Sequence, residues 1–411
     1  MKIIDSDTHV TEPVDLWTSR LPAKWKEAAP QVHLDDQTGD YRWHVGSTWL
    51  TKVAQYSHAG WHEFVPGSPH SLEEADPAGW DPKARIERMD ELGIWAQVLY
   101  PNLMGFESLT FMAHDDKDFA LACVQAYNDF TTEFVSGHED RFIPITVLPF
   151  WNLDAAIAEL ERCAAAGHKG LLWANKFEQV SLPSFTDKHW DPIYSRCAEM
   201  GLSINFHVGF SSKPDVRSES EEAKETKAAF ARIQMAKPGT KENPPLGESA
   251  IHVARDGIPM LLGNAYTITT LLTSDLCERY PTLKFVSVES GFGYVPYLLE
   301  ACDWMWTNSG AYDAYPKRPL PSEYFIRQCY GTFWFEEKTL PLLAHYPDNF
   351  MVETDFPHPI SMTPGPGSYA EHPGERAQRL IIDRLPQDLV SKVLYDNAAN
   401  VYNFGLVKAR A

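Results

Sequence analysis

The chain has 411 residues, of which 36 are basic and 56 acidic, so its formal net charge is −20. This excess of negative charge argues against nucleic acid and anionic membrane surfaces as partners. No apolar run approaches the roughly 18 residues that span a bilayer, and Lys2 leads into strand-like residues rather than a signal peptide. Six scattered cysteines without a CxxC pair are typical of a reducing compartment. We therefore expect a soluble, cytoplasmic protein.

Short apolar runs that resemble strands recur eight times along the chain. In chain order they are residues 2–7, 94–100, 142–148, 170–175, 202–208, 284–289, 328–335 and 349–355. Between them lie helical patterns followed directly by Gly or Pro, at residues 82–92, 153–166, 189–200 and 271–280. Such alternation predicts a parallel sheet, and eight units predict a single (β/α)8 barrel of the TIM type. The alternative is an open doubly wound sheet, but no glycine-rich phosphate loop follows the first strand.

Two connections are much longer than the others. They cover about residues 17–80, which are rich in Trp, Tyr, His and Pro, and about residues 210–270, which include a charged stretch. Loops of this length are usually lids, substrate walls or interfaces. We expect both insertions to form a lid or an interface on one barrel domain that spans residues 1–411.

Residues able to bind a metal or transfer a proton stand at the ends of four predicted strands. They are Asp7 and His9, His207, Glu289 and Asp355. Side chains alternate along a strand, so Asp7 and His9 point to the same side. A barrel brings the carboxyl ends of all its strands to one mouth. Each residue alone could be a core histidine or a loop-capping acid, but four strand ends of this kind favour one shared metal site.

These motifs resemble the amidohydrolase superfamily. The Asp-x-His start, the histidine after strand five and the segment from Thr354 to His358 are closest to its branch of aminocarboxymuconate-semialdehyde and aromatic-acid decarboxylases. Residues 396–402 are similar to the closing N-A-x-x-x-[FY] helix of that branch. The resemblance covers the barrel but neither insertion.

The resemblance implies four ligands for one divalent metal ion, namely Asp7, His9, His207 and Asp355. It also implies that Asp355 acts as the acid–base group and that His207 contributes to catalysis. Two imidazoles with two carboxylates suit Zn²⁺, Mn²⁺ or Fe²⁺ equally well.

Two positions depart from the family pattern. Glu289 stands where a histidine is common; it could accept a proton and act catalytically, bind the metal or orient a neighbour. Asn175 ends strand four, where binuclear members carry a carboxylated lysine or a glutamate, so one metal is favoured over two. We expect Asn175 and His358 to lie in the second shell around the metal, although His358 could equally be a surface-loop residue.

Branch membership favours non-oxidative decarboxylation of an aromatic or enolic carboxylic acid. Glu289 and the anionic ligand set favour the alternative, a hydrolase that cleaves a C–C, ester, lactone or amide bond with metal-activated water. A non-catalytic metal- or ligand-binding barrel is the second alternative.

The expected partner is a small, aromatic substrate, because tryptophans are frequent. They are Trp43, Trp49, Trp61, Trp304, Trp306 and Trp334. Core and lid packing would explain them equally well. Cationic groups for an acidic substrate would be Lys213, Arg217, Arg232 or Arg255. Analogy with acidic barrels that carry large insertions suggests a homodimer.

Overall fold

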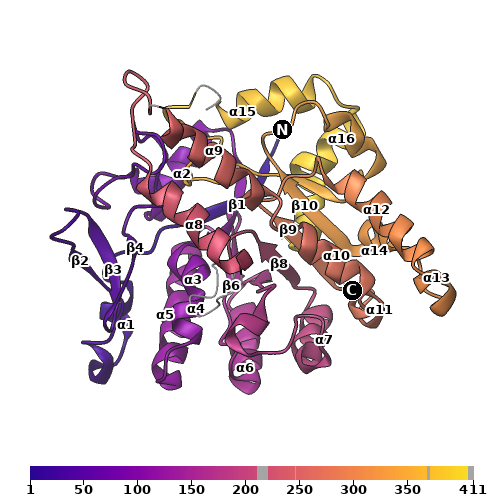
Figure 1. Cartoon of the computed structure of the whole chain (residues 1–411), viewed down its shortest axis with the longest axis horizontal. Coiled ribbons are helices and arrows are strands. Elements are labelled where there is room, and N and C mark those ends of the chain that lie inside the picture. The colour runs from indigo at the N-terminus through magenta and orange to yellow at the C-terminus, as the bar shows by residue number, and fades with distance from the viewer. Residues whose placement is uncertain (211–220, 246, 368–370, 406–411) are drawn as a thin grey trace.

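The computed structural model describes residues 1–210, 221–245, 247–367 and 371–405. Eight parallel strands form one sheet that curls into a nearly closed barrel with helices around it (Figure 1). The strands in spatial order are β1 (Ile4–Val10), β5 (Ala96–Pro101), β6 (Phe142–Thr146), β7 (Gly170–Leu172), β8 (Ser203–His207), β9 (Lys284–Val288), β10 (Cys329–Phe333) and β11 (Phe350–Val352). The predicted (β/α)8 barrel is confirmed.

The barrel closes between its last and first strands just beyond β11. The Asp355 N–H donates to the Asp7 carbonyl at 3.0 Å, and the His9 N–H donates to the Phe356 carbonyl at 2.7 Å. Thr8 and Phe356 also form an isolated parallel bridge. These hydrogen bonds hold Asp355 beside Asp7 and His9, at the mouth.

Helices cover the outside of the barrel. The longer ones in the barrel region are α2 (Pro82–Glu91), α5 (Lys117–Val135), α6 (Leu153–Ala165), α7 (Asp191–Met200), α10 (Ala265–Thr273), α12 (Val295–Asn308) and α14 (Pro321–Gln328). Shorter ones are α1 (Leu16–Arg20), α3 (Leu103–Phe106), α4 (Ser108–Met112), α11 (Leu276–Arg279), α13 (Ala311–Ala314), α15 (Pro373–Arg376), α16 (Gln387–Ser391) and α17 (Asn397–Val401).

One predicted helix is wrong in its extent. Residues 271–280 do not form a single helix, because α10 ends at Thr273 and α11 begins at Leu276. The backbone of Ser274 is extended, with ψ 176°, and its hydroxyl accepts the Leu276 N–H at 3.2 Å. A serine that hydrogen-bonds the backbone in this way competes with a continuous helix.

The two insertions have their own secondary structure and touch each other. The first contains the antiparallel sheet β2 (Gln31–Leu34), β3 (Tyr41–Val45) and β4 (Thr48–Lys52). The second contains the packed helices α8 (Glu221–Met235) and α9 (Glu248–Leu261). A bridge between Glu63 and Thr240 joins them. The first insertion also reaches the loop after β11, where the His58 N–H donates to the Pro357 carbonyl at 2.7 Å.

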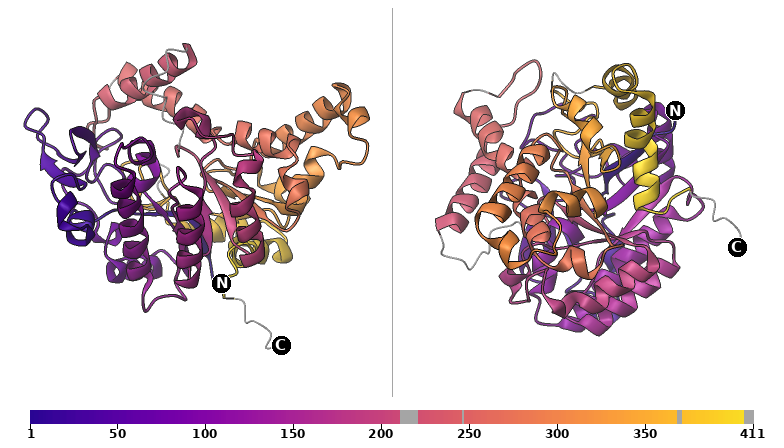
Figure 2. Two further views of the ribbon diagram at one scale, coloured as in Figure 1. Left: turned by 90° about the horizontal axis from the view of Figure 1, so that it is seen from below. Right: turned by 90° about the vertical axis from the view of Figure 1, so that its right-hand side faces the viewer.

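The left view in Figure 2 shows the N-terminus at the lower edge of the barrel, while α8, α9, α12 and α13 project from its upper side. The mouth formed by the carboxyl ends of the strands therefore lies among the projecting elements. Among the described helices, none is long and apolar enough to cross a membrane.

Candidate metal centre

Four predicted ligands converge at the barrel mouth. The Nε2 atoms of His9 and His207 are 2.9 Å apart. Asp7 Oδ1 lies 3.6 Å from the first and 3.4 Å from the second, and Asp355 Oδ1 lies 3.7 Å from His9 Nε2. All four side chains are buried. Four ligand atoms from three separate strand ends therefore surround one small volume.

The hydrogen bonds of the two histidines define where their lone pairs point. His9 Nδ1 lies 3.0 Å from the Pro101 carbonyl oxygen, and His207 Nδ1 lies 2.6 Å from that of Val208. A carbonyl can only accept, so each Nδ1 carries a hydrogen. In the neutral rings both Nε2 atoms then present lone pairs to each other, an arrangement that a cation between them would stabilise.

Unpartnered carboxylate oxygens support the same conclusion. Within the described chain, neither oxygen of Asp7 nor Asp355 Oδ1 has a hydrogen-bond donor of good geometry. A buried carboxylate oxygen without a partner is costly. Two imidazole nitrogens and two such carboxylates are suitable ligands for a divalent metal ion, so these residues fit the metal implied by the motif.

Glu289 joins the same cluster. Its ligand oxygens and those of Asp7 and Asp355 lie within 4.8 Å of one another, and Glu289 Oε2 is 3.6 Å from His207 Nδ1. Both Glu289 and Asp355 have left-handed backbones, with φ of 57° and 59°. This conformation is strained for residues other than glycine and is concentrated at functional sites.

Burial and mutual repulsion shift the pKa values of these groups. Burial raises the pKa of Asp355 well above its ordinary value, and Glu289 and Asp7 add to the effect. Burial also raises the pKa of Glu289 to about 8, although His207 opposes the shift. For His207 burial acts to lower the pKa, but Asp7 and Glu289 raise it to about 9. Without a cation, the cluster therefore retains protons at neutral pH.

His358 lies directly on this centre. Its ring stacks on His9 with centroids 3.7 Å apart, and its Nδ1 is 2.9 Å from Asp355 Oδ1. Its Nε2 is 2.7 Å from Asn102 Oδ1, while Asn102 Nδ2 donates to Thr11 Oγ1 at 3.3 Å. The amide orientation makes Asn102 Oδ1 an acceptor, so His358 carries a hydrogen on Nε2 and turns Nδ1 toward Asp355.

The loop after β5 is held by a buried carboxylate. Glu12 Oε1 accepts the N–H groups of Asn102, Leu103 and Met104 at 3.2, 2.8 and 3.3 Å. This contact places Asn102 against His358. It also sets the start of the short helix that carries Phe106.

Two aromatic rings stand beside the centre. Phe106 stacks on His9 with centroids 5.6 Å apart, and Tyr56 from the first insertion lies 5.0 Å from Phe106 and 5.4 Å from His358. Gly209 has φ +82°, and a Cβ there would come within 2.8 Å of the Phe106 ring. Glycine at this position therefore permits the close approach of Phe106.

The contacts of the other predicted residues are as follows. Asn175 Nδ2 donates to Thr267 Oγ1 at 2.8 Å, so its amide contacts the start of α10. Arg232 and Arg255 both pair with Asp256 in the second insertion. Lys213 and Arg217 lie outside the described residues.

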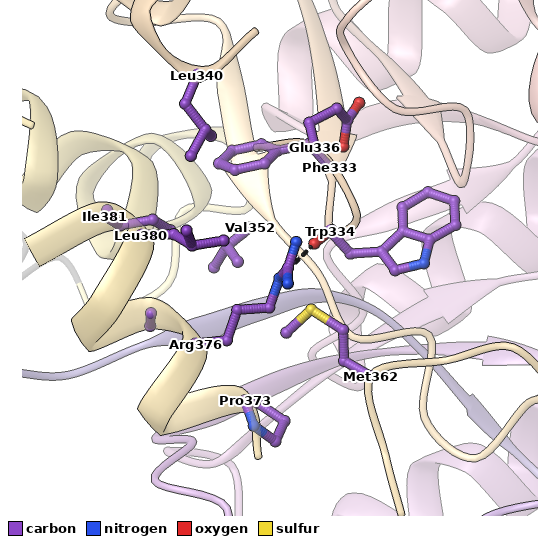
Figure 3. A pocket seen from close by; sticks show the side chains of 11 residues that line it. Phe333, Trp334, Glu336, Leu340, Val352, Met362, Pro373, Arg376, Leu380 and Ile381 are labelled. Atoms are coloured by element: carbon purple, nitrogen blue, oxygen red, sulfur yellow. Dashed lines mark hydrogen bonds between the residues drawn. The ribbon is translucent and has the colours of Figure 1, made fainter. Parts of the chain in front are cut away.

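The tryptophans do not form one aromatic pocket. Trp43 packs in the core against Trp17, whereas Trp49 and Trp304 are exposed. Trp334 lines a small cavity of about 20 Å³ behind β10 and β11, where Arg376 Nε donates to its carbonyl (Figure 3). That volume holds at most one or two water molecules. This cavity is therefore too small for the substrate.

Sequence reasoning missed Asn102, Glu12, Phe106 and Tyr56. Asn102 lies two residues beyond the predicted second strand, residues 94–100, as His9 lies two beyond the first, so the strand-end argument applied to it as well. The sequence did not indicate the other three as site residues. Their positions depend on how a loop and an insertion pack over the barrel mouth.

Comparison with known proteins identifies the family. A family model described as Amidohydrolase matches residues 4–404, and the chain belongs to this family. One curated relative, 2-keto-4-carboxy-3-hexenedioate hydratase from Sphingobium sp., is 24% identical over 190 residues. That match covers 44% of this chain and 44% of the hydratase, so less than half of either protein is aligned.

Solved structures show the same fold. An amidohydrolase from Mycobacterium avium subsp. paratuberculosis superposes with a TM-score of 0.69 at 20% identity, covering 98% of this chain and 99% of that one. A dihydroxybenzoic acid decarboxylase from Polaromonas sp., solved with bound manganese and the inhibitor 2-nitroresorcinol, gives 0.60 at 18% identity, with 99% and 98% covered.

Proposed function

We propose that this protein is a metal-dependent carboxy-lyase that removes CO₂, without an oxidant, from an aromatic or enolic carboxylic acid. The observation that carries the proposal is the convergence of two imidazole Nε2 atoms and two unpartnered carboxylates beside the Phe106 and Tyr56 rings. Structural relatives include a decarboxylase with manganese and an aromatic inhibitor, which supports the same chemistry.

In this proposal Asp7, His9, His207 and Asp355 hold one divalent ion. When bound, the ion supplies Lewis-acid polarisation of an oxygen of the substrate. The Phe106 and Tyr56 rings provide an apolar wall for a flat, conjugated acid. Mn²⁺, Zn²⁺ and Fe²⁺ all suit the ligands.

Decarboxylation breaks a C–C bond, and the carbon that loses CO₂ must receive a proton. We assign this transfer to Asp355, the acid–base group that the family resemblance implies, because its carboxyl group lies in the candidate metal-binding cluster beside Glu289. Glu289 is the more open group, with 18% of its side chain exposed against 3% for Asp355. Glu289 can therefore return a proton from solvent to the buried centre.

Addition or removal of water is the second candidate, with hydrolysis as its close variant. Glu289 favours it, because a carboxylate there can accept a proton from water as readily as deliver one. The curated relative is a hydratase, which supports the same alternative.

The test is a set of parallel assays on protein loaded with Mn²⁺, Zn²⁺ or Fe²⁺. We expect CO₂ release from hydroxybenzoates or enolic acids and its loss on chelation. Hydration of unsaturated oxo acids, or cleavage of esters and lactones, without CO₂ release would favour the second candidate. Turnover that survives metal removal would overturn both.

The variant Asp355→Asn tests whether the protein is an enzyme or a non-catalytic binding barrel. We expect turnover to fall about 10²–10⁴-fold, the usual contribution of a positioned acid–base group, while the far-UV circular dichroism stays the same. Asp348→Asn is the matched control, because Asp348 is exposed and pairs only with Lys392 among the described residues. A metal-binding protein without turnover in any assay would support the non-catalytic alternative.

A further inference from the structure

A completely buried arginine lies beside the candidate metal centre. Arg85 is on α2, and its Nη2 donates to the His9 carbonyl at 2.5 Å and to the Gly79 carbonyl at 3.3 Å. Its Nη1 donates to Gln97 Oε1 at 3.0 Å, and its Nε donates to the Ala78 carbonyl. These acceptors are neutral, and none of the ion pairs found in the described chain includes Arg85. A buried charge with only neutral partners is costly, which indicates a specific role.

Arg85 supports the seam where the barrel closes between β1 and the segment after β11. The carbonyl that it binds belongs to His9, whose own N–H donates to the Phe356 carbonyl at 2.7 Å. The guanidinium carbon also lies 4.5 Å from the centroid of the Phe356 ring. Three proposed ligands, Asp7, His9 and Asp355, belong to this seam. One side chain therefore contacts both sides of it.

Arg85 is connected to the seam by a second route. Gln97, which accepts from Arg85 through Oε1, donates from Nε2 to Asp5 Oδ2 at 3.2 Å. Asp5 in turn accepts the N–H and the hydroxyl of Thr354, the residue before Asp355. Hydrogen bonds therefore connect Arg85 to the backbone next to Asp355.

We propose that Arg85 is a positioning residue for the metal centre, which holds the His9 backbone in place relative to Asp355 before the ion binds. The proposal rests on the proposed metal site, but not on the reaction that this site performs. Arginine suits the role because its planar guanidinium has five N–H donors in a fixed geometry, whereas a lysine ammonium has three on a flexible stem. A lysine at this position would keep the charge but could not bind all four acceptors equally well.

Two other roles for Arg85 predict different results. If its charge acted mainly by repelling the ion, its removal would strengthen metal binding. If Arg85 only attached α2 to the barrel, its removal would reduce stability and leave the metal affinity of the folded protein unchanged. Positioning predicts weaker metal binding both when the charge is kept and when it is removed.

The test is calorimetric titration of the metal-free chain with Mn²⁺, without substrate, for Arg85→Lys and Arg85→Met. We expect Kd to rise about 10–100-fold for Arg85→Met, the usual effect of losing a group that orients a metal ligand. Kd should rise for Arg85→Lys as well. The electron paramagnetic resonance spectrum of bound Mn²⁺ should change in both variants, because it depends on the arrangement of the ligands.

Arg141→Met is the matched control. Arg141 also binds backbone carbonyls, those of Trp95 at 2.6 Å and Ile94 at 3.4 Å, and its guanidinium carbon lies 5.0 Å from the centroid of the Trp95 ring. These contacts precede β5 and β6, at the opposite end of the barrel from the metal centre. Arg141→Met should reduce stability, measured by urea unfolding, and leave Kd unchanged.

Unchanged or stronger metal binding by the folded Arg85 variants would overturn the proposal, as would equal weakening by Arg141→Met. If neither Arg85 variant folds, Gln97→Leu replaces them, because it removes a single hydrogen bond of Arg85 and the link to Asp5. Its Kd should also rise, and an unchanged Kd would count against the role of Arg85. If the unaltered chain bound no metal, the proposed metal site itself would be wrong, and the role of Arg85 with it.

Discussion

Asp5 and Asp7 stand two residues apart on β1 and are both completely buried, yet their surroundings are opposite. Asp5 accepts hydrogen bonds from the Thr354 N–H at 2.8 Å, the Thr354 hydroxyl at 2.6 Å and Gln97 Nε2 at 3.2 Å. Neither oxygen of Asp7 has such a donor in the described chain. Asp5, whose oxygens accept hydrogen bonds, links β1 to neighbouring segments of the barrel. Asp7, whose oxygens have no such donor and lie beside two imidazoles, can bind a cation.

The largest expected effect separates these two aspartates. Asp7→Ala should weaken metal binding by more than the 10–100-fold typical of losing a group that only hydrogen-bonds a ligand, with little loss of stability in the metal-free protein. Asp5→Ala should retain the metal but reduce the free energy of unfolding by about 1–3 kcal/mol, because buried donors lose their acceptor. Metal titration and urea unfolding of metal-free protein measure both. Equal effects of the two variants on both quantities would contradict this distinction.

The second prediction concerns pH and the metal. The pKa of His207 in the metal-free protein is raised to about 9, so His207 is protonated at neutral pH and must lose that proton to bind. Affinity should therefore increase up to about tenfold per pH unit for each proton displaced and level off above about pH 9. The pKa of Glu289, raised to about 8, adds proton release in the same range.

Calorimetry in buffers of different ionisation enthalpy counts the protons that leave on binding. Asp7→Asn offers a second test: it weakens metal binding, and it also removes the attraction that raises the His207 pKa. It should shift the plateau of affinity to lower pH. Affinity that stays constant from neutral pH to about pH 9 would show that protons and metal do not compete for His207.

The barrel and the convergence of the four candidate ligands could be predicted because both follow local patterns. Eight apolar runs separated by helical stretches define the strand order, and the barrel geometry then brings together whatever residues end the strands. This rule alone predicts the convergence of four side chains, those of Asp7, His9, His207 and Asp355. The left-handed backbone of Glu289 could not be predicted in this way, because a glutamate in the sequence does not indicate a positive φ.

The surroundings of the site depend on contacts between distant segments and could not be predicted. Asn102 contacts His358 because Glu12 accepts hydrogen bonds from the loop after β5. Tyr56 belongs to an insertion whose sequence shows no recognisable pattern, and it lies beside His358. The tryptophans left two explanations open for a related reason. The number of tryptophans does not show where their side chains point. Trp43 lies in the core against Trp17, whereas Trp304 is exposed to solvent.

The third prediction tests the positioning of His358. Asn102→Leu removes the acceptor that holds its Nε2–H, and we expect turnover to fall about 10–100-fold. Metal content should stay unchanged, because the Asn102 side chain contacts His358 and Thr11 and none of the four proposed ligands. Asn102→Asp keeps an acceptor and should restore most of the activity. Equal losses in both variants would indicate damage to the loop rather than to His358.

The smallest expected effect concerns the aromatic wall. Phe106→Leu retains apolar contact with Gly209 but loses the ring that stacks on His9 and contacts Tyr56. Aromatic pairs contribute about 0.5–1.5 kcal/mol beyond their buried area, so KM for a planar acid should rise about 2–12-fold while kcat and metal content change little. Tyr56→Phe keeps both rings and serves as the control. If Phe106→Leu lowered kcat and left KM unchanged, the ring would act on the ligand histidines rather than on the substrate, and its stacking on His9 would then be its main contribution.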